Sequence, residues 1–124
     1  MEKKKPIKVK PAFYANCYYY LKKIANVYGY NLVIHGSLDR DLDLVAIPWK
    51  KELGNCDTMI MEFAMFLGGT IMDQYDEHDN LRMFGNMNHG RINYIINLNR
   101  RRDSEGEDLQ YYLDISVTPV IKQN

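Results

Sequence analysis

The stretch of sequence that decides the fold is residues 34–49, which read IHGSLDRDLDLVAIPW. In it, a Gly-Ser pair ends one apolar run, and two aspartates that alternate with leucines open the next. Side chains two residues apart on a β-strand point to the same face of the sheet. We therefore expect Asp41 and Asp43 to project together, while the leucines that alternate with them enter the core.

This pair of carboxylates has two interpretations. Two carboxylates held side by side repel each other, and a divalent cation bound between them relieves that repulsion. On this interpretation Asp41 and Asp43 begin a metal-dependent site for phosphoryl transfer. The alternative is that the Leu-Asp-Arg-Asp segment is an ordinary solvated turn at the end of a hairpin.

A third carboxylate lies near the C-terminus, within residues 110–117, which read QYYLDISV. The aromatic and β-branched content of this segment predicts a strand. Asp114 shares one face of that strand with Tyr112 and Ser116. Aspartate is depleted in strands and is costly to bury without a partner. Asp114 is therefore a candidate third member of the site.

These motifs resemble those of the nucleotidyltransferase superfamily, the fold seen in the catalytic domain of polymerase β. The signature of that superfamily is a Gly-Ser pair, then Asp-x-Asp on one strand, and a third Asp on a later strand. Gly36 and Ser37 match the Gly-Ser pair. Asp41 and Asp43 match the paired acids, and Asp114 matches the third.

The resemblance implies a metal-dependent enzyme. Asp41, Asp43 and Asp114 would be its catalytic residues and would bind Mg²⁺ or Mn²⁺. The reaction implied is transfer of a nucleotidyl group from a nucleoside triphosphate to an acceptor that the sequence does not identify. Asp114 would also take the proton of the acceptor hydroxyl as a general base.

The resemblance also implies which residues bind the nucleotide. Gly36 and Ser37 would contact phosphate oxygens through backbone amides and the hydroxyl group. Arg40 and Arg91 would pair with the phosphates through bidentate hydrogen bonds. Only three residues separate Ser37 from Asp41, fewer than in typical members of the superfamily, which implies a shortened phosphate-binding turn.

Other functions remain open on the same residues. The wider pattern around the Gly-Ser pair also resembles small proteins encoded by phages and prophages. Such a protein would use the same fold, without catalysis, to bind a nucleotide or a host factor and so sequester or inhibit a host defence pathway. A third interpretation is a protein-interaction module whose tyrosine-rich first helix is the contact surface. The resemblance to phage proteins would place the chain in the host cytoplasm.

The composition is that of an ordinary globular domain. Of the 124 residues, 46% are hydrophobic and 26% are charged. Equal numbers of basic and acidic side chains, 16 of each, disfavour a dedicated binder of duplex nucleic acid. No apolar run reaches the length of about 18 residues that a membrane span needs. Cys17 and Cys56 are expected to be reduced, as in a cytoplasmic protein. The expected partners are a nucleotide ligand and, on the alternative interpretations, a protein.

The hydrophobic patterns predict an α+β fold. We expect helices and strands in the following order: helix 12–28, strand 30–35, strand 42–47, helix 56–67, a short strand at 81–84, strand 92–98 and strand 110–117. The last two strands would form a hairpin. This order fits an α+β sandwich, in which helices pack on one face of a mixed β-sheet. The resemblance implies that this is a minimal nucleotidyltransferase-like fold.

The domain limits follow from the same patterns. We expect a flexible basic arm over residues 1–11, a single nucleotidyltransferase-like domain over 12–118 and a tail over 119–124. Trp49, just past the second strand, is expected to cover the core. The apolar positions with helical spacing in the first helix, which we expect to be buried, are Phe13, Cys17, Tyr20, Leu21, Ile24, Val27 and Tyr28.

Overall fold

The computed structural model describes residues 9–38, 41–72, 74–75, 81–82, 86–88, 91–98 and 111–118. Two α-helices occur in these residues, α1 (Val9–Val27) and α2 (Cys56–Leu67). The long strands are β1 (Tyr30–His35), β2 (Leu42–Pro48), β7 (Arg91–Asn97) and β8 (Tyr112–Val117). The short strands are β3 (Thr70–Ile71), β4 (Gln74–Tyr75), β5 (Leu81–Arg82) and β6 (Asn86–Asn88).

The main sheet is mixed. Its strands lie in the order β1-β2-β8-β7-β3, and β6 also pairs with β7. The pairing of β2 with β8 is parallel, whereas β1 with β2 and β7 with β8 are antiparallel. Strands β4 and β5 form a separate two-stranded sheet. The α+β class, the mixed sheet and the C-terminal hairpin are therefore confirmed.

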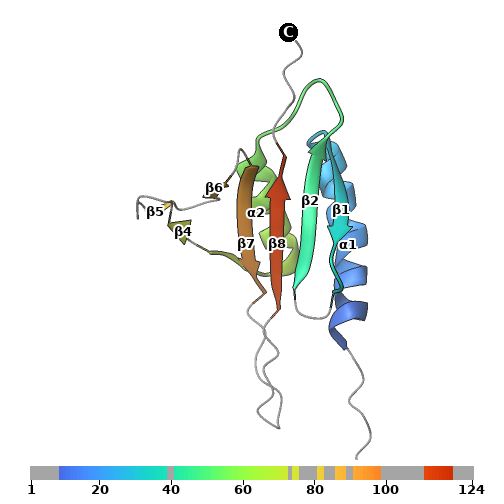
Figure 1. Cartoon of the computed structure of the whole chain (residues 1–124). Helices are drawn as coiled ribbons and strands as arrows, with labels where there is room; N and C mark the ends of the chain where they lie inside the picture. The colour runs from blue at the N-terminus through green and yellow to red at the C-terminus, as the bar shows by residue number, and fades with distance from the viewer. Residues whose placement is uncertain are drawn as a thin grey trace, which may run out of the picture.

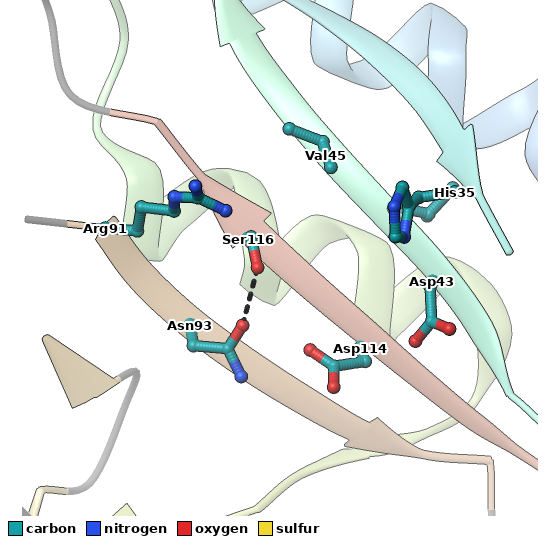
Figure 2. A pocket seen from close by; sticks show the side chains of 8 residues that line it. His35, Asp43, Val45, Arg91, Asn93, Asp114 and Ser116 are labelled. Atoms are coloured by element: carbon teal, nitrogen blue, oxygen red, sulfur yellow. Dashed lines mark hydrogen bonds between the residues drawn. The ribbon is translucent and has the colours of Figure 1, made fainter. Parts of the chain in front are cut away.

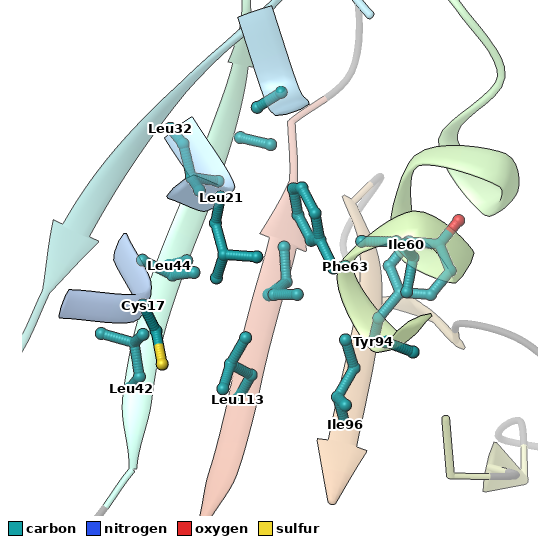
Figure 3. Close-up of a cluster of buried hydrophobic side chains, with 14 of the residues drawn as sticks. Cys17, Leu21, Leu32, Leu42, Leu44, Ile60, Phe63, Tyr94, Ile96 and Leu113 are labelled. Atoms are coloured by element: carbon teal, nitrogen blue, oxygen red, sulfur yellow. The ribbon is translucent and has the colours of Figure 1, made fainter. Parts of the chain in front are cut away.

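Both helices pack on one face of the main sheet, behind the strands in Figure 1. Alternation along each strand sends one set of side chains toward the helices and the other set to the opposite face. The largest fully buried side chains meet between the helices and the sheet (Figure 3); they are Tyr14, Tyr94, Phe63, Leu21, Leu32, Leu42, Leu44, Met59, Ile60, Ile96, Leu113 and Ile115. We call the opposite face, which no described helix covers, the open face.

The elements with long patterns have nearly the predicted bounds. β1 and α2 match their predictions, β2 extends one residue further to Pro48, and β7 begins one residue earlier at Arg91. α1 begins at Val9, inside the predicted flexible arm. The rest of that arm and the tail 119–124 lie outside the described residues. The sequence patterns missed β3, β4 and β6, which have two or three residues each.

The buried face of α1 differs from the predicted one. Tyr14 and Ala25 are fully buried, whereas Tyr20 is 50% exposed and Val27 is 80% exposed. Large apolar side chains surround most of this helix, so their spacing does not determine which face meets the sheet. The prediction was also wrong for Trp49, which is 57% exposed and does not cover the core.

α2 begins and ends where its sequence signals lie. The Asn55 side chain caps the helix by accepting a hydrogen bond from the Thr58 amide at 3.0 Å. Gly68 ends it in the left-handed conformation, at φ +67°. In the first turn, the Asp57 carboxylate accepts a hydrogen bond from the Tyr94 hydroxyl at 2.5 Å, which ties α2 to β7. Neither described helix has the length and apolarity needed to cross a membrane.

Candidate functional site

Two of the predicted acids lie directly opposite each other on the open face. Strand β2 alternates buried leucines with outward side chains, which turns Asp43 away from the helices. Strand β8 does the same with Asp114, between buried Leu113 and Ile115. Because β2 and β8 are parallel and adjacent, their register pairs Asp43 with Asp114. Residues 71 positions apart in the chain are thus neighbours on one surface.

A pocket of about 270 Å³ lies over this pair. On its β1 side, His35 is the cross-strand neighbour of Asp43. Figure 2 shows Arg91 at the opposite side, on β7, with its guanidinium group near the end of β8. The residues that line the pocket are His35, Asp43, Leu44, Val45, Arg91, Asn93, Asp114 and Ser116.

The two carboxylates are electrostatically strained. Burial raises the pKa of Asp43 above its ordinary value, and the nearby carboxylates of Asp114 and Asp41 raise it further, while His35 opposes the shift. Burial also raises the pKa of Asp114, with a further contribution from Asp41. A cation bound beside Asp43 and Asp114 would stabilise their ionised forms, which burial and mutual repulsion destabilise.

A hydrogen-bonded chain positions Asp114. The Ser116 hydroxyl donates to Oδ1 of Asn93 at 2.8 Å. The Asn93 side chain in turn hydrogen-bonds to Asp114, which lowers the pKa of that carboxyl and partly offsets the effect of burial. Sequence reasoning placed Ser116 on the face of Asp114 but missed Asn93, because its place depends on the pairing of β7 with β8.

The Gly-Ser turn closes over Asp43. Gly36 has φ +98°, a conformation that other residues rarely adopt. A Cβ atom at this position would lie 3.1 Å from Oδ2 of Asp43. Leu38 also has a positive φ, of 65°, and packs partly against the core. The backbone of Gly36 therefore comes close to the carboxylate of Asp43.

The other predicted site residues have different positions. Ser37 is exposed on the same turn, and Arg40 lies outside the described residues. Asp41 is half-buried just before β2; it does not line the pocket, although its charge acts on both pocket acids. Within the described ranges, no three His, Cys, Asp or Glu side chains are grouped closely enough to hold a metal ion. The pocket thus contains two of the three predicted carboxylates, and the guanidinium group of Arg91 lies at its far side.

No protein family, curated protein or solved structure matches this chain. The resemblance to the nucleotidyltransferases therefore stays a prediction, as do its catalytic and phage-related consequences.

Proposed function

We propose that this chain is a metal-dependent nucleotidyltransferase-like protein that binds a nucleoside triphosphate in the pocket on the open face. The observation that carries the proposal is the register of Asp43 with Asp114 on adjacent parallel strands. Both carboxylates are half-buried and both have raised pKa values, so they are poorly neutralised by their surroundings. Perturbed acids gathered in a pocket are a common property of functional sites.

The donor set of the pocket suits a hard divalent cation. Mg²⁺ is usually held by one or two carboxylates together with the phosphate oxygens of a substrate, and Asp43 and Asp114 supply such a pair. The missing Cβ of Gly36 leaves the approach to Oδ2 of Asp43 clear. Asp41 adds negative charge near the pair. A bound cation would neutralise charge on the carboxylates and on the phosphates during displacement at phosphorus.

The other residues would bind the phosphates and move a proton. Arg91 is exposed in the pocket and would donate bidentate hydrogen bonds to phosphate oxygens. Asp114, held by Asn93, would accept the proton of an acceptor hydroxyl. The acceptor oxygen then forms a bond to the α-phosphorus, and the bond from that phosphorus to the leaving pyrophosphate breaks.

A second candidate function is nucleotide binding without transfer. It is favoured by the position of Asp41, which does not line the pocket. Two carboxylates suffice to hold one cation with a nucleotide, whereas two-metal catalysis needs ligands for a second ion. A protein of this kind would sequester its ligand and release it unchanged.

One titration experiment tests both candidates. Calorimetry would measure the binding of MgCl₂ and MnCl₂, alone and with nucleoside triphosphates and cyclic nucleotides. The test variant is Asp43→Asn. The matched control is Asp57→Asn, which removes the same charge at the start of α2, outside the pocket lining, and keeps an oxygen that can accept the hydrogen bond from Tyr94.

Metal-dependent nucleotide binding that is lost in Asp43→Asn and kept in Asp57→Asn would support the site. Mass spectrometry of the same samples then separates the two functions. Release of pyrophosphate indicates transfer, and recovery of intact nucleotide indicates sequestration. If the unmodified protein binds no nucleotide with either metal, both candidate functions are wrong.

A further inference from the structure

The open face carries an apolar patch beside the acidic pair. Val33 on β1 lies opposite Val45 on β2, and Ile47 follows Val45 by two residues along β2. Even spacing from Asp43 places these β2 side chains on the open face. Val33 is 39% exposed and Ile47 is 41% exposed. We call Val33, Val45 and Ile47 the apolar patch.

The apolar patch is continuous with the pocket. Val45 lines the pocket together with Asp43, and Figure 2 shows it further along β2 from that carboxylate. The step from Asp43 to Val45 is about 6.7 Å along the strand, and adjacent strands are about 4.8 Å apart. The patch spans two adjacent strands and one such step along β2, from Val45 to Ile47, which are about the dimensions of a flat ring system.

The side chains of β7 and β8 that line the pocket are polar or charged. Asn93 and Ser116 pair with each other across β7 and β8, at the level of Val45 on β2. Arg91 lies two residues from Asn93 and brings a positive charge to that side of the pocket. The face therefore combines three chemistries: an acidic pair, a cationic and polar wall, and an apolar patch.

We propose that the apolar patch binds the nucleobase of the ligand. This inference rests on the proposed function, because the acidic pair and Arg91 would hold the phosphates. Ligand sites commonly combine apolar surface with a few fixed polar groups, and a base presents an apolar ring face with a polar edge. Asn31, exposed and opposite Ile47, carries an amide group that can both donate and accept hydrogen bonds at that edge.

The inference predicts a difference between a nucleotide and its phosphates alone. With MgCl₂ present, we expect at least one of ATP, GTP, CTP and UTP to bind about tenfold more tightly than inorganic tripolyphosphate, because only the nucleotide buries the patch. The test variant is the double substitution Val33→Thr with Ile47→Thr, which keeps β-branched side chains on both strands. It should reduce nucleotide affinity to that of tripolyphosphate and leave tripolyphosphate affinity unchanged.

The matched control is Val27→Thr, the same substitution at an exposed valine of α1. It should leave the affinities for nucleotide and tripolyphosphate as they are. Unchanged tripolyphosphate affinity in the double variant also shows that the variant is folded. Light scattering of each protein would establish its oligomeric state.

Three outcomes overturn the inference. In the first, tripolyphosphate binds as tightly as every nucleotide, which leaves the metal-phosphate site standing without a base site. In the second, the double variant still binds nucleotide more tightly than tripolyphosphate, which shows that the patch does not bind the base. If the double variant also converts a dimer into a monomer, the patch is a contact between two copies of the chain. In the third, neither nucleotide nor tripolyphosphate binds, and the proposed function fails as well.

Discussion

At the scale of the residue, Gly36 has the strictest requirement in the site. Its φ of +98° excludes most side chains, and a Cβ atom would approach Oδ2 of Asp43 to 3.1 Å. Gly68, at φ +67°, also has a positive φ, but no heavy atom outside its own turn of the chain lies within 4 Å of its Cβ position. A substitution at Gly68 therefore tests the cost of backbone strain alone, whereas a substitution at Gly36 tests that strain together with contact against the Asp43 carboxylate.

We predict that Gly36→Ala destabilises the protein more than Gly68→Ala does. The second substitution should cost about 1 kcal/mol of unfolding free energy, from backbone conformation alone. The first adds displacement of the Asp43 carboxylate, so it should also weaken metal binding. Urea denaturation and metal titration of both variants check this. Equal costs, with metal binding intact in both, would contradict the close approach.

The pKa of Asp114 leads to a second prediction at this scale. Burial raises that pKa above the ordinary value of 3.8. For an acid with a raised folded-state pKa, the associated stability is present below the unfolded-state pKa and is lost as pH rises through the folded-state value. At neutral pH the ionised carboxylate therefore destabilises the fold.

Accordingly, Asp114→Asn should raise the melting temperature at pH 7 by roughly 2–5 °C. The amide keeps an oxygen that can accept the hydrogen bond from Asn93. At about pH 3, where the native carboxyl is protonated, the variant and the native protein should melt together. Calorimetric scans at both pH values provide the measurement, and a lower melting temperature for the variant at pH 7 would refute the interpretation.

At the scale of the element, the site depends on the placement of β8 between β2 and β7. Parallel pairing with β2 sets Asp114 beside Asp43, and antiparallel pairing with β7 brings Asn93 to Ser116. The connection from β2 to β7 contains α2, which anchors these strands from behind through the core. The start of α2 therefore contributes to the stability of the whole arrangement.

We predict that Asn55→Ala lowers the unfolding free energy by about 1 kcal/mol, because the Thr58 amide loses its capping acceptor. Asn55→Asp is the matched control, since its carboxylate can accept the same hydrogen bond and also favours the positive end of the helix dipole. Chemical denaturation of both variants measures the difference. Loss of stability in both would indicate that the amide nitrogen of Asn55, not its oxygen, matters.

At the scale of the whole molecule, the titratable groups with raised pKa values differ between the two faces of the sheet. Acids occupy the open face, whereas three tyrosines, Tyr14, Tyr30 and Tyr94, are buried on the helix face. Burial raises the pKa of Tyr14 to about 12. Burial also raises the pKa values of Tyr30, with its Cys56 contact, and of Tyr94, with its hydrogen bond to Asp57.

Because the pKa values of these buried tyrosines are raised, we predict that the protein unfolds cooperatively at high pH. A tyrosine with a raised folded-state pKa contributes stability below the unfolded-state value of 10.0, and that contribution falls as pH rises through about 12. The unfolding free energy should therefore decline above pH 10. Circular dichroism and tyrosinate absorbance would measure the transition. The part of the absorbance change that comes from the buried tyrosines should coincide with the loss of circular dichroism. Ionisation of every tyrosine before unfolding would contradict the buried environment.

Tyr14→Phe isolates one contribution. It removes the ionisable hydroxyl, which accepts a hydrogen bond from the Tyr112 amide at 3.2 Å, so the variant should be less stable at pH 7 but less sensitive to high pH. Tyr19→Phe, at a half-exposed position on the same helix, is the control and should behave as the native protein does.

The sequence by itself determined the elements with long patterns and the alternation within them. Apolar runs and the alternation of residue types predicted β1, β2, β7 and β8, because local propensity and period agree there. Alternation also placed Asp43 and Asp114 on outward faces. It did not predict β3, because Thr70 and Ile71 form a strand only through pairing with β7.

Only the tertiary structure decided which residues meet. Strand order and direction place Asp43 beside Asp114, bring Asn93 and Arg91 to the same pocket and leave Asp41 outside its lining. The packing of α1 against the sheet likewise buries Tyr14 and leaves Tyr20 half-exposed. Both results depend on contacts between segments far apart in the chain. A local pattern reports the period of a segment, and it carries no information about the surface against which that segment packs.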